Sequence, residues 1–232
     1  MDLLLWTAGV AIVLTCYRRY DVSVTGPRLA VWQAIQMLSA FANGLAIASL
    51  ALFLRYAFRR PCVFPRYAGH WLLLAAGVQT LCGWPAYFAA QRWLEINPIP
   101  SAMPLDFRAQ LVQGLIVNVV GCVIVLLASG AVRELRWRMI CYGWFALGVL
   151  ELLSAAAMLG AEDYLALQLY QWSTIAISAL SAVYVGALVI AAARDRDERR
   201  DWFHFAGVAA SAISFSLAPV YYTLDAWLRD AA

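Results

Sequence analysis

Long apolar stretches separated by short polar segments run through the chain. A helix that crosses a bilayer needs about 20 apolar residues, and every stretch except the first approaches or exceeds that length. The pattern predicts seven membrane-spanning helices, at about residues 2–17, 29–54, 68–92, 109–131, 138–160, 165–192 and 203–228. We therefore expect an all-α, polytopic membrane protein.

Composition supports this prediction and indicates the orientation. Hydrophobic residues make up 64% of the chain and charged residues 13%, whereas a soluble protein has about 25% charged residues. All 17 basic residues are arginines, and a cytoplasmic N-terminus places most of them in inner loops. The positive-inside rule then predicts an inner N-terminus and an outer C-terminus, in a bacterial inner (plasma) membrane. The net charge of +3 follows from these arginines and does not indicate a nucleic-acid partner.

The third predicted helix recurs in the seventh at a shift of 134 residues, and a shift of 135 relates the second to the sixth. The matched pairs include His70 with His204, Pro85 with Pro219, Tyr87 with Tyr221, Trp93 with Trp227, Gln36 with Gln171, and Asn43 with Ser178. Rare residue types that match in one ungapped register indicate an internal repeat. We predict a single transmembrane domain of two parallel three-helix repeats, 1–94 and 138–228, joined by a linker helix at 109–131.

This 3+1+3 order of helices resembles that of SWEET-type sugar transporters and nicotinamide riboside carriers, and more distantly that of microbial rhodopsins. The resemblance is architectural and assigns no functional residue, because the chain has no Pro-Gln pair of the PQ-loop families. A retinal Schiff base requires a lysine in the last helix. The chain contains no lysine, so a rhodopsin is excluded.

Two carboxyl groups are the candidate catalytic or proton-transferring groups. Glu151 lies near the middle of the fifth predicted helix, where a charged side chain costs about 2.5–3.5 kcal/mol. We expect its carboxyl to be protonated, or to accept a hydrogen bond from Asn118, Gln171 or a tyrosine. Asp225 lies closer to the outer surface, and ordinary exposure at the membrane boundary explains it equally well.

Polar and aromatic residues recur at helical spacing on the second, third, sixth and seventh predicted helices. Lipid cannot satisfy polar groups, so these faces should point inward. Packing between helices is the better explanation of the serines and threonines, whereas the amides explain packing and the lining of a water-filled or ligand-binding site equally well. An aromatic pocket with one or two carboxylates suits a flat, cationic or apolar ligand. The candidate substrate-binding residues are Asn43, Trp84, Tyr87, Gln91, Asn118, Gln171 and Tyr221.

Metal and cofactor chemistry is not indicated. His70 and His204 are the only histidines, and two ligands are too few for a closed zinc site. We expect them to anchor their helices at the membrane interface. The five cysteines form no CxxC pair, so we predict no metal site and no cofactor.

The leading prediction is a transporter or permease that binds a small solute between the two repeats. One alternative is a membrane-embedded enzyme acting on an isoprenoid or lipid, such as a terpene-cyclase-like enzyme with Glu151 or Asp225 as general acid. Another is a ligand-sensing or assembly subunit. The expected partners are the lipid bilayer and a small-molecule or lipid-like ligand, and assembly into a homo-oligomer stays open.

Overall fold

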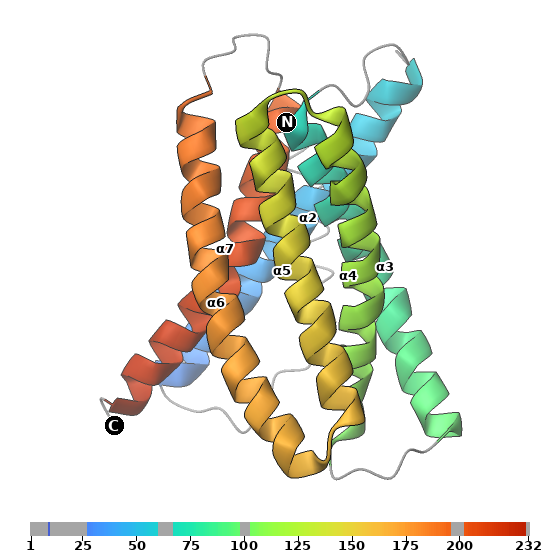
Figure 1. Cartoon of the computed structure of the whole chain (residues 1–232), viewed down its shortest axis with the longest axis vertical. Helices are drawn as coiled ribbons and strands as arrows, with labels where there is room; N and C mark the ends of the chain where they lie inside the picture. Colours follow the sequence, from blue (N-terminus) through green and yellow to red (C-terminus); the bar gives the residue numbers. More distant parts are fainter. Residues whose placement is uncertain (1–8, 10–26, 60–66, 98–102, 196–201, 231–232) are drawn as a thin grey trace. The chain divides into compact units, whose positions relative to one another are not determined.

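The structure is a computed structural model that describes residues 9, 27–59, 67–97, 103–195 and 202–230. These residues form six long helices (Figure 1): α2 Pro27–Arg59, α3 Ala68–Ile96, α4 Leu105–Ala131, α5 Leu135–Gly160, α6 Asp163–Ala193 and α7 Trp202–Asp230. The all-α prediction is therefore confirmed for the described residues. Each helix begins or ends a few residues beyond its predicted apolar stretch. The first predicted helix, at about 2–17, lies outside the described residues apart from Gly9.

Five of these helices contain stretches long and apolar enough to cross a membrane: Gln33–Arg55, Ala68–Ile96, Leu105–Ala131, Leu135–Gly160 and Tyr164–Ala193. In α7 the apolar part of the described residues, Trp202–Leu217, is shorter. Large hydrophobic side chains such as Leu127, Leu153 and Val183 are exposed on these helices. Such surfaces are stable against lipid chains and unstable against water. The chain is therefore an integral membrane protein whose helices contact the bilayer.

Two pairs of helices have matching lengths and positions along the chain. Helices α3 and α7 are both 29 residues long, and they begin and end 134 residues apart. The bounds of α2 and α6 agree with a shift of 135 to within one residue at each end. Pro85 and Pro219 both lie inside their helices.

The chain divides into two compact units. Unit 1 comprises the described parts of residues 1–77 and 181–232, which include α2, the start of α3, the end of α6, and α7. Unit 2 comprises residues 78–180, which include the rest of α3, α4, α5 and the first part of α6.

In unit 1 the first turn of α3 is in backbone contact with the first two turns of α7. A Cβ atom at Gly207 would overlap the carbonyl oxygen of Gly69, and a Cβ atom at Gly69 would overlap the carbonyl oxygen of His204. Only glycine permits this approach, because the obstructing atoms belong to the backbone. Leu72 and Leu73, in the next turn of α3, are completely buried.

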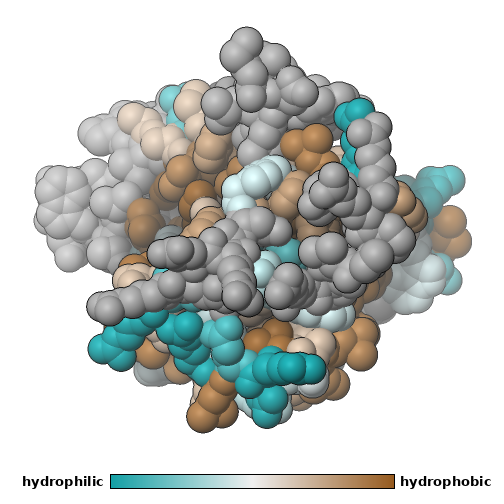
Figure 2. Space-filling model, turned by 90° about the horizontal axis from the view of Figure 1, so that it is seen from above, coloured by the Kyte–Doolittle hydropathy of each residue, from teal (hydrophilic) through white to brown (hydrophobic). Residues whose placement is uncertain are grey.

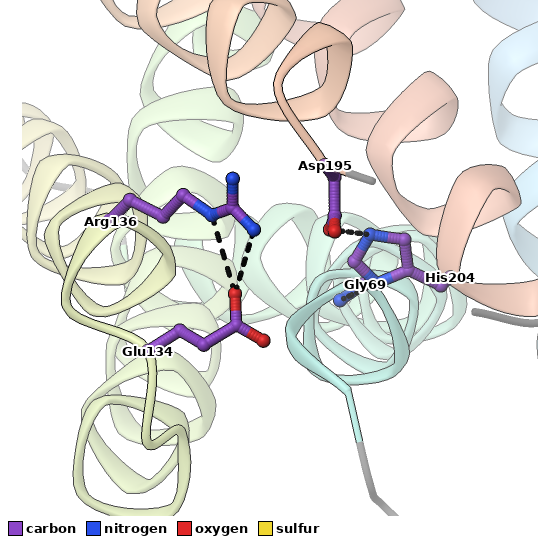
Figure 3. A network of polar contacts seen from close by, with 5 residues as sticks. All are labelled: Gly69, Glu134, Arg136, Asp195 and His204. Carbon is purple, nitrogen blue, oxygen red and sulfur yellow. Dashed lines mark hydrogen bonds and ion pairs between the residues drawn. The ribbon is translucent and has the colours of Figure 1, made fainter. Parts of the chain in front are cut away.

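In unit 2 helices α4 and α5 pack against each other and are joined by a tight turn. Trp137 at the start of α5 is completely buried, and the Arg138 guanidinium donates hydrogen bonds to the Val132 carbonyl at 3.1 and 3.3 Å. Arg133 and Arg136 are exposed at this turn, and Arg136 pairs with Glu134 at 3.1 Å (Figure 3). Figure 2 is seen from this end of the helices and shows hydrophilic residues gathered beside hydrophobic ones. The turn is thus polar, as expected where helices leave a membrane.

Candidate functional site

The candidate site is built around Glu151, which lies well inside α5. Among the described side chains, the other carboxyl groups lie at helix ends or in turns. Asn118 lies in the middle of α4, and its Nδ2 donates a hydrogen bond to Glu151 Oε2 at 2.8 Å. Both side chains are half-buried. Among the described residues, Asn118 is thus the expected donor that contacts this carboxyl.

Small side chains on both helices allow the amide and the carboxyl to meet. A Cβ atom at Gly148, three residues before Glu151, would lie only 2.6 Å from Cys122 Sγ. Cys122 follows Asn118 by one helical turn, and its thiol donates weakly to the Phe145 carbonyl at 3.8 Å. Helices α4 and α5 therefore approach closely beside the Asn118–Glu151 bond.

A second amide packs against α4 from α3, and the sequence analysis did not select it. Gln79 Nε2 donates to the Val117 carbonyl at 3.2 Å, and its side chain occupies the space left free by Gly121. Gly83, one turn further along α3, lies beside the amide of Gln113. The signal that could have found this contact is an amide and a glycine one turn apart in an apolar helix, a pattern typical of helix interfaces in membranes.

The aromatic candidates of α3 lie elsewhere in unit 2. The Tyr87 hydroxyl donates to Asp106 Oδ1 at 3.4 Å near the start of α4. Asp106 precedes Asn118 by twelve residues, or roughly 18 Å along a helix. Trp84 contacts Phe88 of the same helix, with ring centroids 6.1 Å apart. Tyr87 therefore does not share a site with Glu151.

The remaining candidates are distributed over other elements. Gln91 is half-buried on α3, and Gln171 is exposed on α6, although we expected an inward-facing side chain. Asn43 is half-buried on α2, in unit 1. Tyr221 and Asp225 lie on α7, and their side chains are outside the described part of the structure. The structure thus brings together Asn118 and Glu151 from the predicted set.

The two histidines lie in the interior of unit 1, so the prediction that they anchor helices at the membrane interface is wrong. Their exposed fractions are 2% for His70 and 0% for His204. Aromatic rings enclose them: Phe53 and Tyr67 have centroids 5.0 and 5.3 Å from His70, and Tyr67 lies 6.1 Å from His204. In the sequence the histidines lie at helix starts, where exposure is usual, and only the structure shows that α3 and α7 meet there and bury both rings.

Metal binding finds no support in the described residues. Within them, no group of three or more His, Cys, Asp or Glu side chains is placed to hold an ion. The cysteines described as free thiols are Cys82, Cys122 and Cys141.

Comparison with known proteins gives no relative. No protein-family model matches this chain, and neither does any curated protein or solved structure.

Proposed function

We propose that the protein is a proton-coupled carrier of a small solute, in which Glu151 binds and releases the proton. The observation that carries this proposal is the hydrogen bond between Asn118 and Glu151, made inside two helices that can each cross a membrane. A carboxyl at this position costs about 2.5–3.5 kcal/mol when charged. An uncharged side chain could make a purely structural hydrogen bond without this cost. Reversible protonation gives the carboxyl a function that a neutral side chain cannot perform.

The chemistry of the partner suits a carboxyl that changes its protonation state. Asn118 Nδ2 can donate to Glu151 in both states, because the carbonyl oxygen of the neutral acid is also an acceptor. An arginine in the same place would favour the ionised form alone. We infer that the carboxyl keeps its proton while lipid and protein surround it, and loses the proton when water or a solute reaches it.

The architecture that we propose is a seven-helix bundle of two parallel repeats around a linker helix. The equal lengths of α3 and α7 and their constant shift of 134 residues support it. The near-equal bounds of α2 and α6 support it as well. Duplicated halves that move against each other would expose a site to the two sides of a membrane in turn.

Solute-dependent proton uptake into liposomes tests this function. Purified protein is reconstituted into vesicles that contain a pH-sensitive dye, and labelled amino acids, sugars, nucleosides and water-soluble vitamins are added in turn. We expect acidification of the vesicle interior with at least one class of solute. Glu151→Gln keeps the shape and the hydrogen-bonding capacity of the neutral acid but cannot release a proton, so it should abolish the signal.

The matched control is Glu162→Gln, which changes an exposed carboxyl in the turn after α5. This variant should acidify the vesicles at the wild-type rate. Equal acidification by wild type and Glu151→Gln would refute the proposal, and so would the absence of acidification with every solute in the panel.

A further inference from the structure

A buried histidine joins three segments of unit 1 (Figure 3). His204, in the first turn of α7, accepts a hydrogen bond at Nδ1 from the Gly69 backbone N–H, at 3.0 Å. Its other ring nitrogen, Nε2, lies 3.6 Å from Oδ2 of Asp195, which follows the end of α6. Both side chains are completely buried. The imidazole therefore contacts α3 on one side and a carboxylate on the other.

The hydrogen bond from Gly69 defines the protonation state of the ring. A nitrogen that accepts an N–H cannot carry a hydrogen in the same direction, so Nδ1 is unprotonated. The ring is then neutral, and its single proton is on Nε2, toward Asp195. Gly69 is the second residue of α3, and its N–H is one of the four at a helix start that have no partner within the helix. His204 supplies that partner.

A second proton on the ring would break the hydrogen bond from Gly69 and strengthen the contact with Asp195. It would bind at Nδ1, so the Gly69 bond would be lost and two N–H groups would face each other. The positive end of the α3 dipole also disfavours a cation there. On the other side, the imidazolium would form an ion pair with the Asp195 carboxylate.

We propose that His204 and Asp195 form a proton-binding site that controls the contact between the first turns of α3 and α7. The neutral form holds α3 to α7 through the Gly69 N–H, and the protonated form exchanges that bond for the ion pair with Asp195. A proton from solvent forms the new Nδ1–H bond, and no other bond is made or broken covalently. This site uses residues of unit 1 only and does not depend on transport through Glu151.

The described neighbours of the imidazole are one carboxylate and several aromatic rings. Among the described residues, the charged group that faces it is Asp195, from the segment after α6. Tyr67, just before α3, has its ring 6.1 Å from His204 and 5.3 Å from His70. Helix α2 contributes the uncharged ring of Phe53, which contacts Phe203 at 5.3 Å. Gly69 and Gly207 bring the two backbones into contact beside this hydrogen bond. Loss of the bond between Gly69 N–H and His204 Nδ1 would therefore weaken the contact between the helices directly.

Nuclear magnetic resonance of the histidine side chains tests the site, because the chain contains only two histidines. The full-length protein in nanodiscs is labelled with ¹⁵N-histidine, and His70→Gln leaves the signals of His204 alone. We expect a neutral ring with the proton on Nε2 near neutral pH, and a doubly protonated ring after acidification. Asp195→Asn should lower the midpoint of this titration by about one pH unit, because it removes the opposite charge.

Hydrogen exchange over residues 68–73 tests the control of the helix contact. After correction for the intrinsic pH dependence, exchange in wild type should rise several-fold when His204 becomes protonated. His204→Asn places an amide oxygen near the position of Nδ1, so it keeps an acceptor for Gly69 but cannot be protonated. Its exchange should not change with pH. Should His70→Gln fail to fold, the His204 signals in wild type are identified by their absence in His204→Asn.

Several results would overturn the proposal. These are a neutral ring with its proton on Nδ1, an unchanged midpoint in Asp195→Asn, or the same pH-dependent exchange in wild type and His204→Asn. Each would show that protonation of His204 beside Asp195 does not control this helix contact.

Discussion

Two amides inside the helices of unit 2 contact chemically different neighbours. Asn118 binds the carboxyl of Glu151, whereas Gln79 binds a backbone carbonyl of α4. The two contacts therefore differ in chemistry, since a backbone carbonyl does not change its protonation state. At the scale of single residues, this difference separates the candidate proton site from a contact that joins two helices.

The energy of the Asn118–Glu151 contact can be measured with a double-mutant cycle. We expect Asn118→Ala and Glu151→Ala to show a coupling of about 0.5–2 kcal/mol in unfolding from lipid bicelles. The control pairs Glu151→Ala with Gln113→Ala, which changes an amide beside Gly83 of α3, and these effects should add to within about 0.5 kcal/mol. Additivity of Asn118→Ala with Glu151→Ala would contradict the contact.

At the scale of helices, glycines determine how closely the elements of unit 1 approach. Gly69 and Gly207 lie where the backbones of α3 and α7 touch. By contrast, a Cβ atom at Gly186 of α6 would meet nothing within 4 Å. Within this unit, the helix packing thus requires glycine at Gly69 and Gly207 but not at Gly186.

Substitution of these glycines by alanine should have opposite effects. Gly207→Ala should destabilise the protein by about 1–3 kcal/mol, because neither backbone can move aside without separating the helices. Gly186→Ala should be neutral or stabilise by up to about 1 kcal/mol, because alanine favours the helix and no atom obstructs it. Thermal unfolding of both variants in detergent measures the difference. A Gly207→Ala variant as stable as Gly186→Ala would contradict the close approach of α3 and α7.

At the scale of the whole molecule, the number of spans and the distribution of arginines determine the expected membrane topology. An odd number of spans places the two ends of the chain on opposite sides of the membrane. The exposed arginines at the α4–α5 turn, Arg133 and Arg136, belong to the side that we predict to be cytoplasmic. The seven-helix arrangement that we propose and the positive-inside rule therefore lead to the same expectation for the C-terminus.

Reporter fusions test this topology. A reporter at the C-terminus that is active only outside the cytoplasm, such as alkaline phosphatase, should be active, and a fluorescent protein that matures only inside should be dark. The same reporters inserted after Arg133 should give the reverse result. A fluorescent C-terminal fusion would contradict the predicted topology. If the fusion after Arg133 were fluorescent as well, the number of spans after Arg133 would be wrong, and if it were dark, the orientation would be inverted.

The amino-acid sequence alone determined that the chain is helical, where its described helices lie, and that it belongs in a membrane. These properties are local, since a backbone in lipid must form its hydrogen bonds within the helix and apolar length decides what can span the bilayer. Tertiary structure decided which polar groups meet. Helical spacing shows which residues share a face but not which helix lies opposite, so Glu151 could be paired with Asn118, Gln171 or a tyrosine until α5 was placed against α4. The burial of His204 against Gly69 and Asp195 likewise depends on the crossing of α3 and α7, which joins segments that are far apart in the chain.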